Sequence, residues 1–152
     1  VQKLNKNLLL VYTGLKRTAH HIAKSYVNKL QSSKKQYVLK ISEHAKKAEV
    51  ALKKGELDKF GKLLNDAWIE KKKLSSSITN SSIDKIYNKA IKNGALGGKL
   101  LGAGNGGFIL FFVPLKFQKI VRKALNSLLY VPFEFENNGS KIIYRENDDK
   151  NK

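Results

Sequence analysis

A glycine-rich segment followed directly by an apolar run is the part of this sequence best suited to chemistry. Seven of the eleven glycines lie between positions 94 and 114, and Gly102, Gly104 and Gly107 spell G-x-G-x-x-G. Glycine permits backbone with φ > 0 and close approach of another group, so the N–H groups of such a loop can surround a phosphate. The spacing leaves two hypotheses open: a phosphate-binding loop, or a glycine-rich hairpin with no ligand.

The residues around these glycines exclude two familiar phosphate loops. A dinucleotide-binding loop needs a helix after its last glycine and an acidic residue about twenty positions later. Here the apolar run Phe108–Val113 has the composition of a buried strand, and neither position 127 nor position 128 is acidic. A Walker A loop needs Gly-Lys-Ser/Thr, but a phenylalanine follows the last glycine. The glycines are therefore predicted to connect two strands, Leu96–Leu101 and Phe108–Val113.

Composition limits the class of protein. A length of 152 residues with 41% hydrophobic side chains suits one domain with its own core. The absence of cysteine excludes disulfides and thiolate zinc sites and is compatible with the cytoplasm, which is the expected location. No apolar run approaches the roughly twenty residues of a membrane span, so no membrane partner is expected. The sequence has no methionine, and we expect that Val1 is not the natural start.

The net charge of +18 suggests an anionic partner, such as nucleic acid. Only three of the thirty basic residues are arginine, the residue that proteins favour for reading base edges. The lysines are scattered along the faces of predicted helices rather than gathered in one stripe. A solvated surface is therefore favoured over a nucleic-acid interface.

Apolar patterning outlines an alternating series of helices and strands. Leu8–Tyr12 reads as a short buried strand, and Val131–Glu136 alternates like a strand with one buried face. Lys141–Tyr144 is a possible edge strand. Ser81 or Ser82 is expected to cap the helix that follows. Helical spacing predicts four helices before the glycine segment and one after it: Ala19–Leu30, Val38–Leu52, Leu57–Leu74, Ile83–Ile91 and Phe117–Leu129.

The order of these elements predicts an α+β fold. Reduced to its sheet, the order is β-α-β-β-α-β with an expanded first helical connection. This is the ferredoxin-like split βαβ pattern, in which the strands form one antiparallel sheet. We expect one domain over residues 1–146 and a flexible tail at 147–152.

At the glycine segment the sequence resembles a known superfamily. Gly98–Phe108, GKLLGAGNGGF, resembles the third conserved motif of the GHMP kinases, which include galactokinase, homoserine kinase and mevalonate kinase. Their C-terminal domain is ferredoxin-like, in agreement with the element order. Ala67–Leu74, Ile78–Asn80 and Gly94–Gly98 most resemble the branch of D-glycero-D-manno-heptose 7-phosphate kinases.

The resemblance implies an ATP-dependent sugar or sugar-phosphate kinase with ATP and Mg²⁺ as cofactors. Such kinases carry a first domain with a P-x-x-x-G-L-x-S-S-A type loop around the ATP phosphates, and nothing here matches it. The chain therefore resembles a C-terminal half without catalytic residues or metal ligands. Its implied partners are the missing nucleotide-binding domain, a sugar-phosphate substrate and, through exposed apolar surface, a second copy.

The resemblance also suggests site residues. The loop Gly102, Ala103, Gly104, Asn105, Gly106 and Gly107 would face the nucleotide or substrate. Thr13, Gly14 and Arg17 follow the first strand, where arginine could hold a substrate phosphate in its fork geometry. The alternative for these three is a capping threonine and a surface arginine. The alternative for the whole chain is a stand-alone basic domain that binds nucleic acid or another polyanion.

Overall fold

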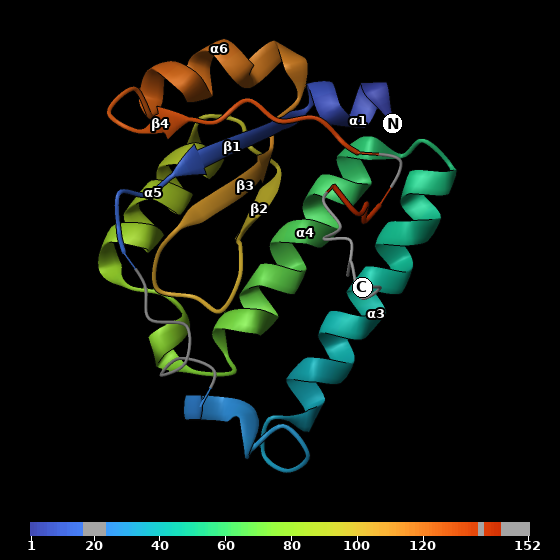
Figure 1. Cartoon of the computed structure of the whole chain (residues 1–152), viewed down its shortest axis with the longest axis vertical. Coiled ribbons are helices and arrows are strands. Elements are labelled where there is room, and N and C mark those ends of the chain that lie inside the picture. The colour runs from blue at the N-terminus through green and yellow to red at the C-terminus, as the bar shows by residue number, and fades with distance from the viewer. Residues whose placement is uncertain (17–23, 137–138, 144–152) are drawn as a thin grey trace, which may run out of the picture.

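A computed structural model describes residues 1–16, 24–136 and 139–143 of the chain (Figure 1). It contains helices packed on and beside one four-stranded sheet. In chain order the elements are α1 (Gln2–Lys6), β1 (Leu8–Tyr12), α3 (Lys35–Lys53), α4 (Leu57–Lys72), the short 3₁₀ helix η1 (Ser76–Ile78), α5 (Ser81–Lys92), β2 (Gly97–Leu100), β3 (Phe108–Phe112), α6 (Leu115–Ala124) and β4 (Leu129–Tyr130).

The sheet has the strand order β2-β3-β1-β4, and every neighbouring pair is antiparallel. The two central strands are therefore the first strand of each βαβ half, as the split βαβ pattern requires. Pairing aligns Tyr12 with Phe108 and Leu100 with Ile109. This register places the end of β1 and the end of β2 beside the start of β3. The prediction of an α+β fold with one antiparallel sheet is confirmed.

One face of the sheet forms the main hydrophobic core with α5 and α6. Side chains point alternately to the two faces of a strand, so every second residue of β1 and β3 contributes to this core. The buried cluster joins Leu9 and Val11 of β1, Ile109 and Phe111 of β3, Tyr87 and Ala90 of α5, and Val121 of α6. The apolar runs that predicted these two strands thus correspond to real burial.

Helix α4 lies along the β2 side of the sheet, and α3 packs on the outside of α4 (Figure 1). Two glycines allow the close approach of α4. A β-carbon at Gly97 would overlap the carbonyl oxygen of Gly61 and lie 2.7 Å from the backbone nitrogen of Asn65. The helix backbone therefore rests directly on the strand backbone.

Local signals mark the end of α3 and the start of α5. Gly55, with φ +74°, follows α3, and its neighbour Glu56 donates its N–H to the carbonyl of Ala51. This is the Schellman arrangement that favours glycine. The N-cap of α5 is Asn80 rather than Ser81 or Ser82, because the Asn80 side chain accepts from the N–H of Ile83 at 3.0 Å.

The C-terminal strand prediction is wrong in position. The strand is Leu129–Tyr130, which pairs with β1, and Val131 adds one N–H bond to the carbonyl of Leu10 at 2.9 Å. Pro132 comes next and has no N–H to donate, so the ladder cannot continue through Val131–Glu136. Helix α6 also ends before the predicted Leu129, at Ala124.

Several other predictions fall at the margins of the described residues. Residues 19–23 of the predicted helix Ala19–Leu30 lie outside the described residues, and residues 24–27 are helical. Residues 141–143 form no strand, and Tyr144 and the predicted tail at 147–152 also lie outside. Within the described part of the chain, no helix has both the length and the apolar character needed to cross a bilayer.

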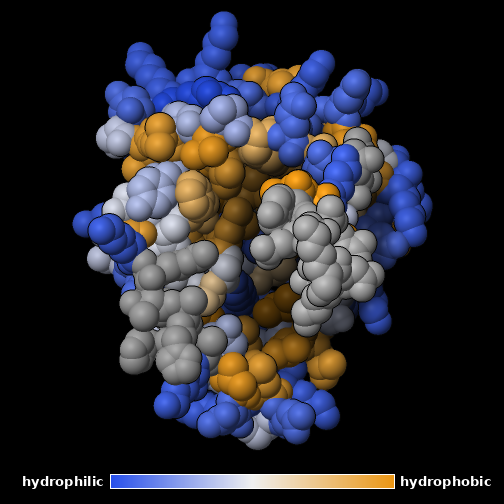
Figure 2. Space-filling view, in the orientation of Figure 1, coloured by the Kyte–Doolittle hydropathy of each residue, from blue (hydrophilic) through white to orange (hydrophobic). Residues whose placement is uncertain are grey.

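The positive charge lies on exposed helix surfaces. In Figure 2 polar and charged side chains gather at the upper edge of the molecule, where Figure 1 places α6, while apolar side chains remain visible near the centre. The exposed basic residues of α6 are Lys116, Lys119, Arg122 and Lys123.

The contact between α4 and β2 generates the first prediction. Gly97→Ala should lower the free energy of unfolding by about 3 kcal/mol, because the new methyl group must push α4 away from β2. Urea unfolding followed by circular dichroism measures the change. Gly55→Ala is the control, because a β-carbon there meets no atom within 4 Å and only the left-handed backbone is strained, by about 1 kcal/mol. Unchanged or increased stability of Gly97→Ala would contradict the close contact.

Candidate functional site

The glycine segment forms a loop that connects β2 to β3. The N–H of Leu101 donates to the carbonyl of Phe108 at 2.8 Å and closes the base of the loop. Five loop positions have positive φ: +77° at Gly102, +132° at Gly104, +59° at Asn105, +159° at Gly106 and +89° at Gly107. Asparagine is one of the few residues other than glycine that tolerates this conformation. The prediction of a glycine connection between two antiparallel strands is confirmed.

The turn after β1 is bonded directly to this loop. Thr13 donates its backbone N–H to the Gly107 carbonyl at 2.9 Å, and its hydroxyl donates to the same oxygen at 2.8 Å. Gly107 in turn donates its N–H to the carbonyl of Leu15 at 3.0 Å. The two candidate regions, separated by about ninety positions in the sequence, thus form one structural unit.

A second set of contacts joins the loop to η1 and the start of α5. The N–H of Asn105 donates to the carbonyl of Ile78 at 2.8 Å. The Asn80 side-chain amide donates to the Asn105 side-chain oxygen at 2.6 Å. Because Asn80 also caps α5, one side chain connects the loop to the helix that covers the sheet.

Lys71, near the end of α4, holds the other side of the loop. Its ammonium group donates to the Gly102 carbonyl at 2.7 Å. A charge-assisted bond of this kind contributes more than a bond between neutral groups. The loop is therefore held by the turn after β1, by η1 and Asn80, and by α4.

Packing explains two of the loop glycines without any ligand. A β-carbon at Gly104 would lie 2.8 Å from both the Cα and the carbonyl oxygen of Ile78. A β-carbon at Gly106 would lie 2.7 Å from the carbonyl oxygen of Leu15. The neighbouring atoms are backbone, so they cannot move as a flexible side chain would. At these positions the hairpin interpretation and the phosphate-loop interpretation both require glycine.

The loop offers a limited set of groups to a ligand. The N–H groups of Asn105 and Gly107 already donate within the chain, so they are not directed at a phosphate. Gly102 and Asn105 are exposed, whereas Gly104, Gly106 and Gly107 are buried. Among the described residues no three His, Cys, Asp or Glu side chains gather as a metal site.

Shifted pKa values do not point to acid–base chemistry at the loop. Glu43, Glu49 and Glu56 have lowered pKa values because each carboxylate accepts a hydrogen bond from a nearby lysine on an exposed helix surface. Burial raises the pKa of the Tyr87 hydroxyl, which donates to the Gly98 carbonyl at 3.2 Å. This tyrosine supports β2 just before the loop and stays protonated at neutral pH.

The structure brings together most of the predicted site residues. Thr13 is buried beside Gly107, and Gly14 is exposed in the turn with φ +76°. Arg17 lies outside the described residues. The spacing of residues in the sequence does not indicate Lys71 or Asn80 as partners of the loop. Asn80 lies three positions before the first apolar residue of its helix, which is a capping signal. No local signal indicates its second hydrogen bond, to the side chain of Asn105.

Comparisons with known proteins agree with the geometry. Residues 48–131 match the model of a family described as GHMP kinases C terminal. A D-glycero-alpha-D-manno-heptose 7-phosphate kinase of Campylobacter jejuni is 32% identical over 142 residues, which is 91% of this chain and 42% of the relative. The chain thus spans less than half the length of this relative.

Solved structures show the same fold. A mevalonate kinase of L. major superposes with a TM-score of 0.72 at 21% identity, covering 81% of this chain and 40% of the kinase. A D-glycero-D-manno-heptose 1-phosphate kinase of Bacteroides thetaiotaomicron superposes with a TM-score of 0.59 at 26% identity, covering 89% and 34%. In both cases the similarity is limited to part of the larger protein.

The amide contact between Asn80 and Asn105 generates the second prediction. Asn80→Ala should cost about 1–2 kcal/mol of unfolding free energy, because it removes a helix cap and the bond to the loop. Asn105→Gly keeps the left-handed backbone and should cost at most about 1 kcal/mol. The double variant should show coupling of about 0.5–1 kcal/mol in urea unfolding.

Asn93→Ala is the matched control for this cycle. Among the described residues, the Asn93 amide donates only to the carbonyl of Lys89 within its own helix, at 2.7 Å. Its effect should therefore add to that of Asn105→Gly without coupling. If Asn80→Ala and Asn105→Gly were also additive, the side-chain contact between Asn80 and Asn105 would contribute nothing to stability.

Proposed function

The chain belongs to the GHMP kinase C-terminal family, and on this premise we propose that it is the C-terminal half of an ATP-dependent sugar or sugar-phosphate kinase. The proposed substrate is a heptose 7-phosphate, and the proposed reaction transfers the ATP γ-phosphoryl group to a sugar hydroxyl. The observation that carries this proposal is the similarity to the Campylobacter jejuni heptose 7-phosphate kinase over 91% of the chain. The hydrogen bonds between the glycine loop and the turn after β1 support the proposal that these two segments act together.

The proposed cofactors, ATP and Mg²⁺, are not accommodated by the described residues alone. Two loop N–H groups are already bonded within the chain, and no acidic cluster is present among the described residues. We therefore assign the nucleotide phosphates and the metal mainly to a further domain. The relative is more than twice as long as its matched part, which leaves room for such a domain.

Within this proposal the glycine loop acts as a positioning element. Phosphoryl transfer depends on the alignment of the reacting groups, and displacement by 1 Å can cost about a hundredfold in rate. The loop is held on three sides, by Thr13, Asn80 and Lys71, while Gly102 and Asn105 stay exposed. This exposed tip is the surface that would contact the nucleotide-binding domain or the substrate.

Thr13, Gly14 and Arg17 remain candidates for the substrate phosphate. The Thr13 hydroxyl already donates to Gly107, so it stabilises the loop whether or not a substrate is present. Gly14 is exposed beside it and leaves open space for a ligand. Arg17 follows within three positions and would supply the charge.

The alternative function, polyanion binding by a stand-alone basic domain, has little support. The basic residues lie on separate exposed helix faces. The heptose 7-phosphate kinase reported above and two further curated relatives are named as kinases of sugars or sugar phosphates. A cytoplasmic location is proposed with the kinase function, since a chain without cysteine suits a reducing compartment.

The third prediction tests the kinase activity. The 152-residue chain alone should not phosphorylate heptose 7-phosphate, because we assign the nucleotide phosphates and the metal mainly to a further domain. The protein expressed with its upstream coding sequence should do so in the presence of ATP and Mg²⁺. Coupled ADP release and mass spectrometry of the sugar product measure the reaction. Turnover by the purified chain alone, or none by the longer protein with any sugar or sugar phosphate, would contradict the proposal.

The fourth prediction tests the loop in the longer protein. Gly104→Ala should lower turnover by about a hundredfold, because the new β-carbon must move the loop away from Ile78. Gly55→Ala, which strains the same kind of backbone without a contact, should keep turnover unchanged. Circular dichroism at the assay temperature separates unfolding from loss of catalysis. Normal turnover of a folded Gly104→Ala enzyme would reduce the loop to a structural turn.

A further inference from the structure

Two aromatic side chains lie directly beside the glycine loop. Tyr12 is the last residue of β1 and Phe108 is the first residue of β3, and the register of the sheet pairs them. Their ring centroids are 5.1 Å apart. The carbonyl of Phe108 accepts the N–H of Leu101 at 2.8 Å, and Thr13, which follows Tyr12, donates its N–H to Gly107 at 2.9 Å. The two rings are therefore held at the base of the loop.

This aromatic pair points away from the main hydrophobic core. Because side chains alternate along a strand, Ile109 and Phe111 point into the core, and Phe108 points to the other face of the sheet. Helix α4 covers that face at the far end of β3, where the ring of Phe60 contacts the ring of Phe112. Phe112 is fully buried there, whereas Phe108 is 38% exposed. The sheet surface is therefore more open at the glycine loop.

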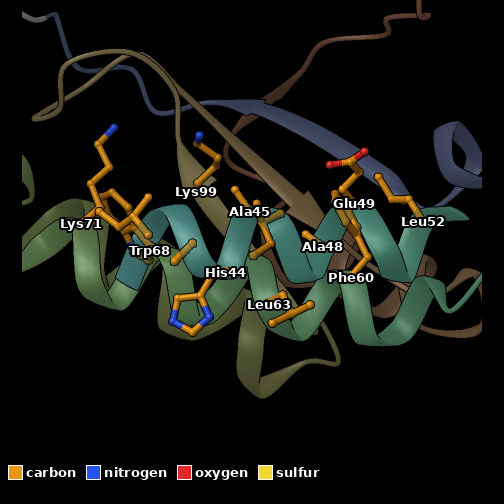
Figure 3. Close-up of a pocket in the computed structure, with 13 residues that line it drawn as sticks. His44, Ala45, Ala48, Glu49, Leu52, Phe60, Leu63, Trp68, Lys71 and Lys99 are labelled. Atoms are coloured by element: carbon orange, nitrogen blue, oxygen red, sulfur yellow. The ribbon is translucent and has the colours of Figure 1, made fainter. Parts of the chain in front are cut away.

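The open end of the sheet is distinct from the hollow between α3 and α4. Figure 3 shows this hollow, which the two helices line together with Lys99 of β2. Neither Tyr12 nor Phe108 is one of its lining residues. The aromatic pair instead adjoins the glycine loop and the turn after β1, the two segments proposed to act together.

The pair offers a ring surface and an available hydroxyl group. The hydroxyls of Tyr87 and Tyr130 donate to the carbonyls of Gly98 and Arg122, each at 3.2 Å. The Tyr12 hydroxyl has no such partner within the described part of the chain. Cross-strand packing accounts for the contact between the two rings. It leaves the hydroxyl free to bond a ligand.

A sugar ring matches these groups better than a phosphate or a metal ion does. A sugar presents C–H groups on one face of its ring and hydroxyl groups at its edge. The electron-rich face of an aromatic ring attracts the positively polarised C–H groups, and a phenol can donate to or accept from a sugar hydroxyl. A phosphate or a magnesium ion gains nothing from an apolar ring surface. The aromatic pair therefore suits the organic part of a sugar phosphate.

We propose that Tyr12 and Phe108 bind the sugar ring of the substrate, an inference that rests on the proposed kinase function. The sugar ring lies against the two aromatic rings, and the Tyr12 hydroxyl bonds a sugar hydroxyl. The phosphate of the substrate then lies at the adjoining turn, where Gly14 leaves open space. The pair binds the sugar and takes no part in phosphoryl transfer. Its loss should therefore change the affinity for the sugar phosphate and not the turnover number.

The test uses the protein expressed with its upstream coding sequence. Calorimetric titration with heptose 7-phosphate, without ATP, measures the Kd. Phe108→Leu keeps the apolar bulk but removes the aromatic face, and it should raise this Kd about fivefold to tenfold. Tyr12→Phe removes only the hydroxyl and should raise it about threefold to tenfold. In steady-state kinetics, kcat and the KM for ATP should stay unchanged.

Phe135→Leu is the matched control. Phe135 is 42% exposed and contacts the ring of Phe133 at 6.1 Å between centroids. This second aromatic pair lies at the other end of β1, where the Asn5 amide donates to the Phe133 carbonyl at 3.4 Å. Phe135→Leu should leave the Kd of heptose 7-phosphate unchanged. Circular dichroism verifies folding, and Tyr12→Phe keeps the test valid if Phe108→Leu fails to fold.

Four results would overturn the inference. The first is an unchanged Kd of heptose 7-phosphate in both variants, which would assign the exposed rings to contact with a further domain. The second is an equal loss of affinity in Phe135→Leu. The third is a raised Kd of ATP with unchanged sugar affinity, which would place the adenine base on the rings. The fourth is no measurable binding of heptose 7-phosphate.

The calorimetric measurement also separates this inference from the kinase function. Binding of heptose 7-phosphate that depends on Phe108, without any phosphorylation, would contradict only the kinase function. Phosphorylation of heptose 7-phosphate with a Kd that neither Phe108→Leu nor Tyr12→Phe changes would contradict only the role of the aromatic pair.

Discussion

The direct contact of α4 with β2 determines where the functional groups of this domain lie. Gly97 and Gly61 lack side chains at the point of contact, so the helix backbone rests on the strand. Small residues are the usual means by which a helix approaches another backbone closely. From this position α4 buries Trp68 in the core beside Tyr87 and extends Lys71 to the glycine loop. If the helix moved outward by the width of a methyl group, these contacts would be affected together.

The loop illustrates why a glycine motif is ambiguous when read as spacing alone. Gly104 and Gly106 face backbone atoms of Ile78 and Leu15, so packing within the domain already excludes a β-carbon. A phosphate-binding loop would exclude it for another reason, namely the approach of the ligand. The steric requirement for glycine therefore does not distinguish a structural turn from a phosphate-binding loop. Only the exposed positions of the loop can distinguish the two roles. Gly102 and Asn105 are those positions in this loop.

Local patterns were sufficient for the architecture but not for the contacts that build the site. The apolar runs of β1 and β3 and the helical spacing of apolar residues in α3 and α5 are signals within a few residues, and the elements they predicted are present. The position of β4 was missed because alternation at Val131–Glu136 outweighed the missing N–H of Pro132. The bonds of Asn80 and Lys71 to the loop span 25 and 31 positions. Such bonds depend on the packing of α4 and α5, which no local pattern encodes.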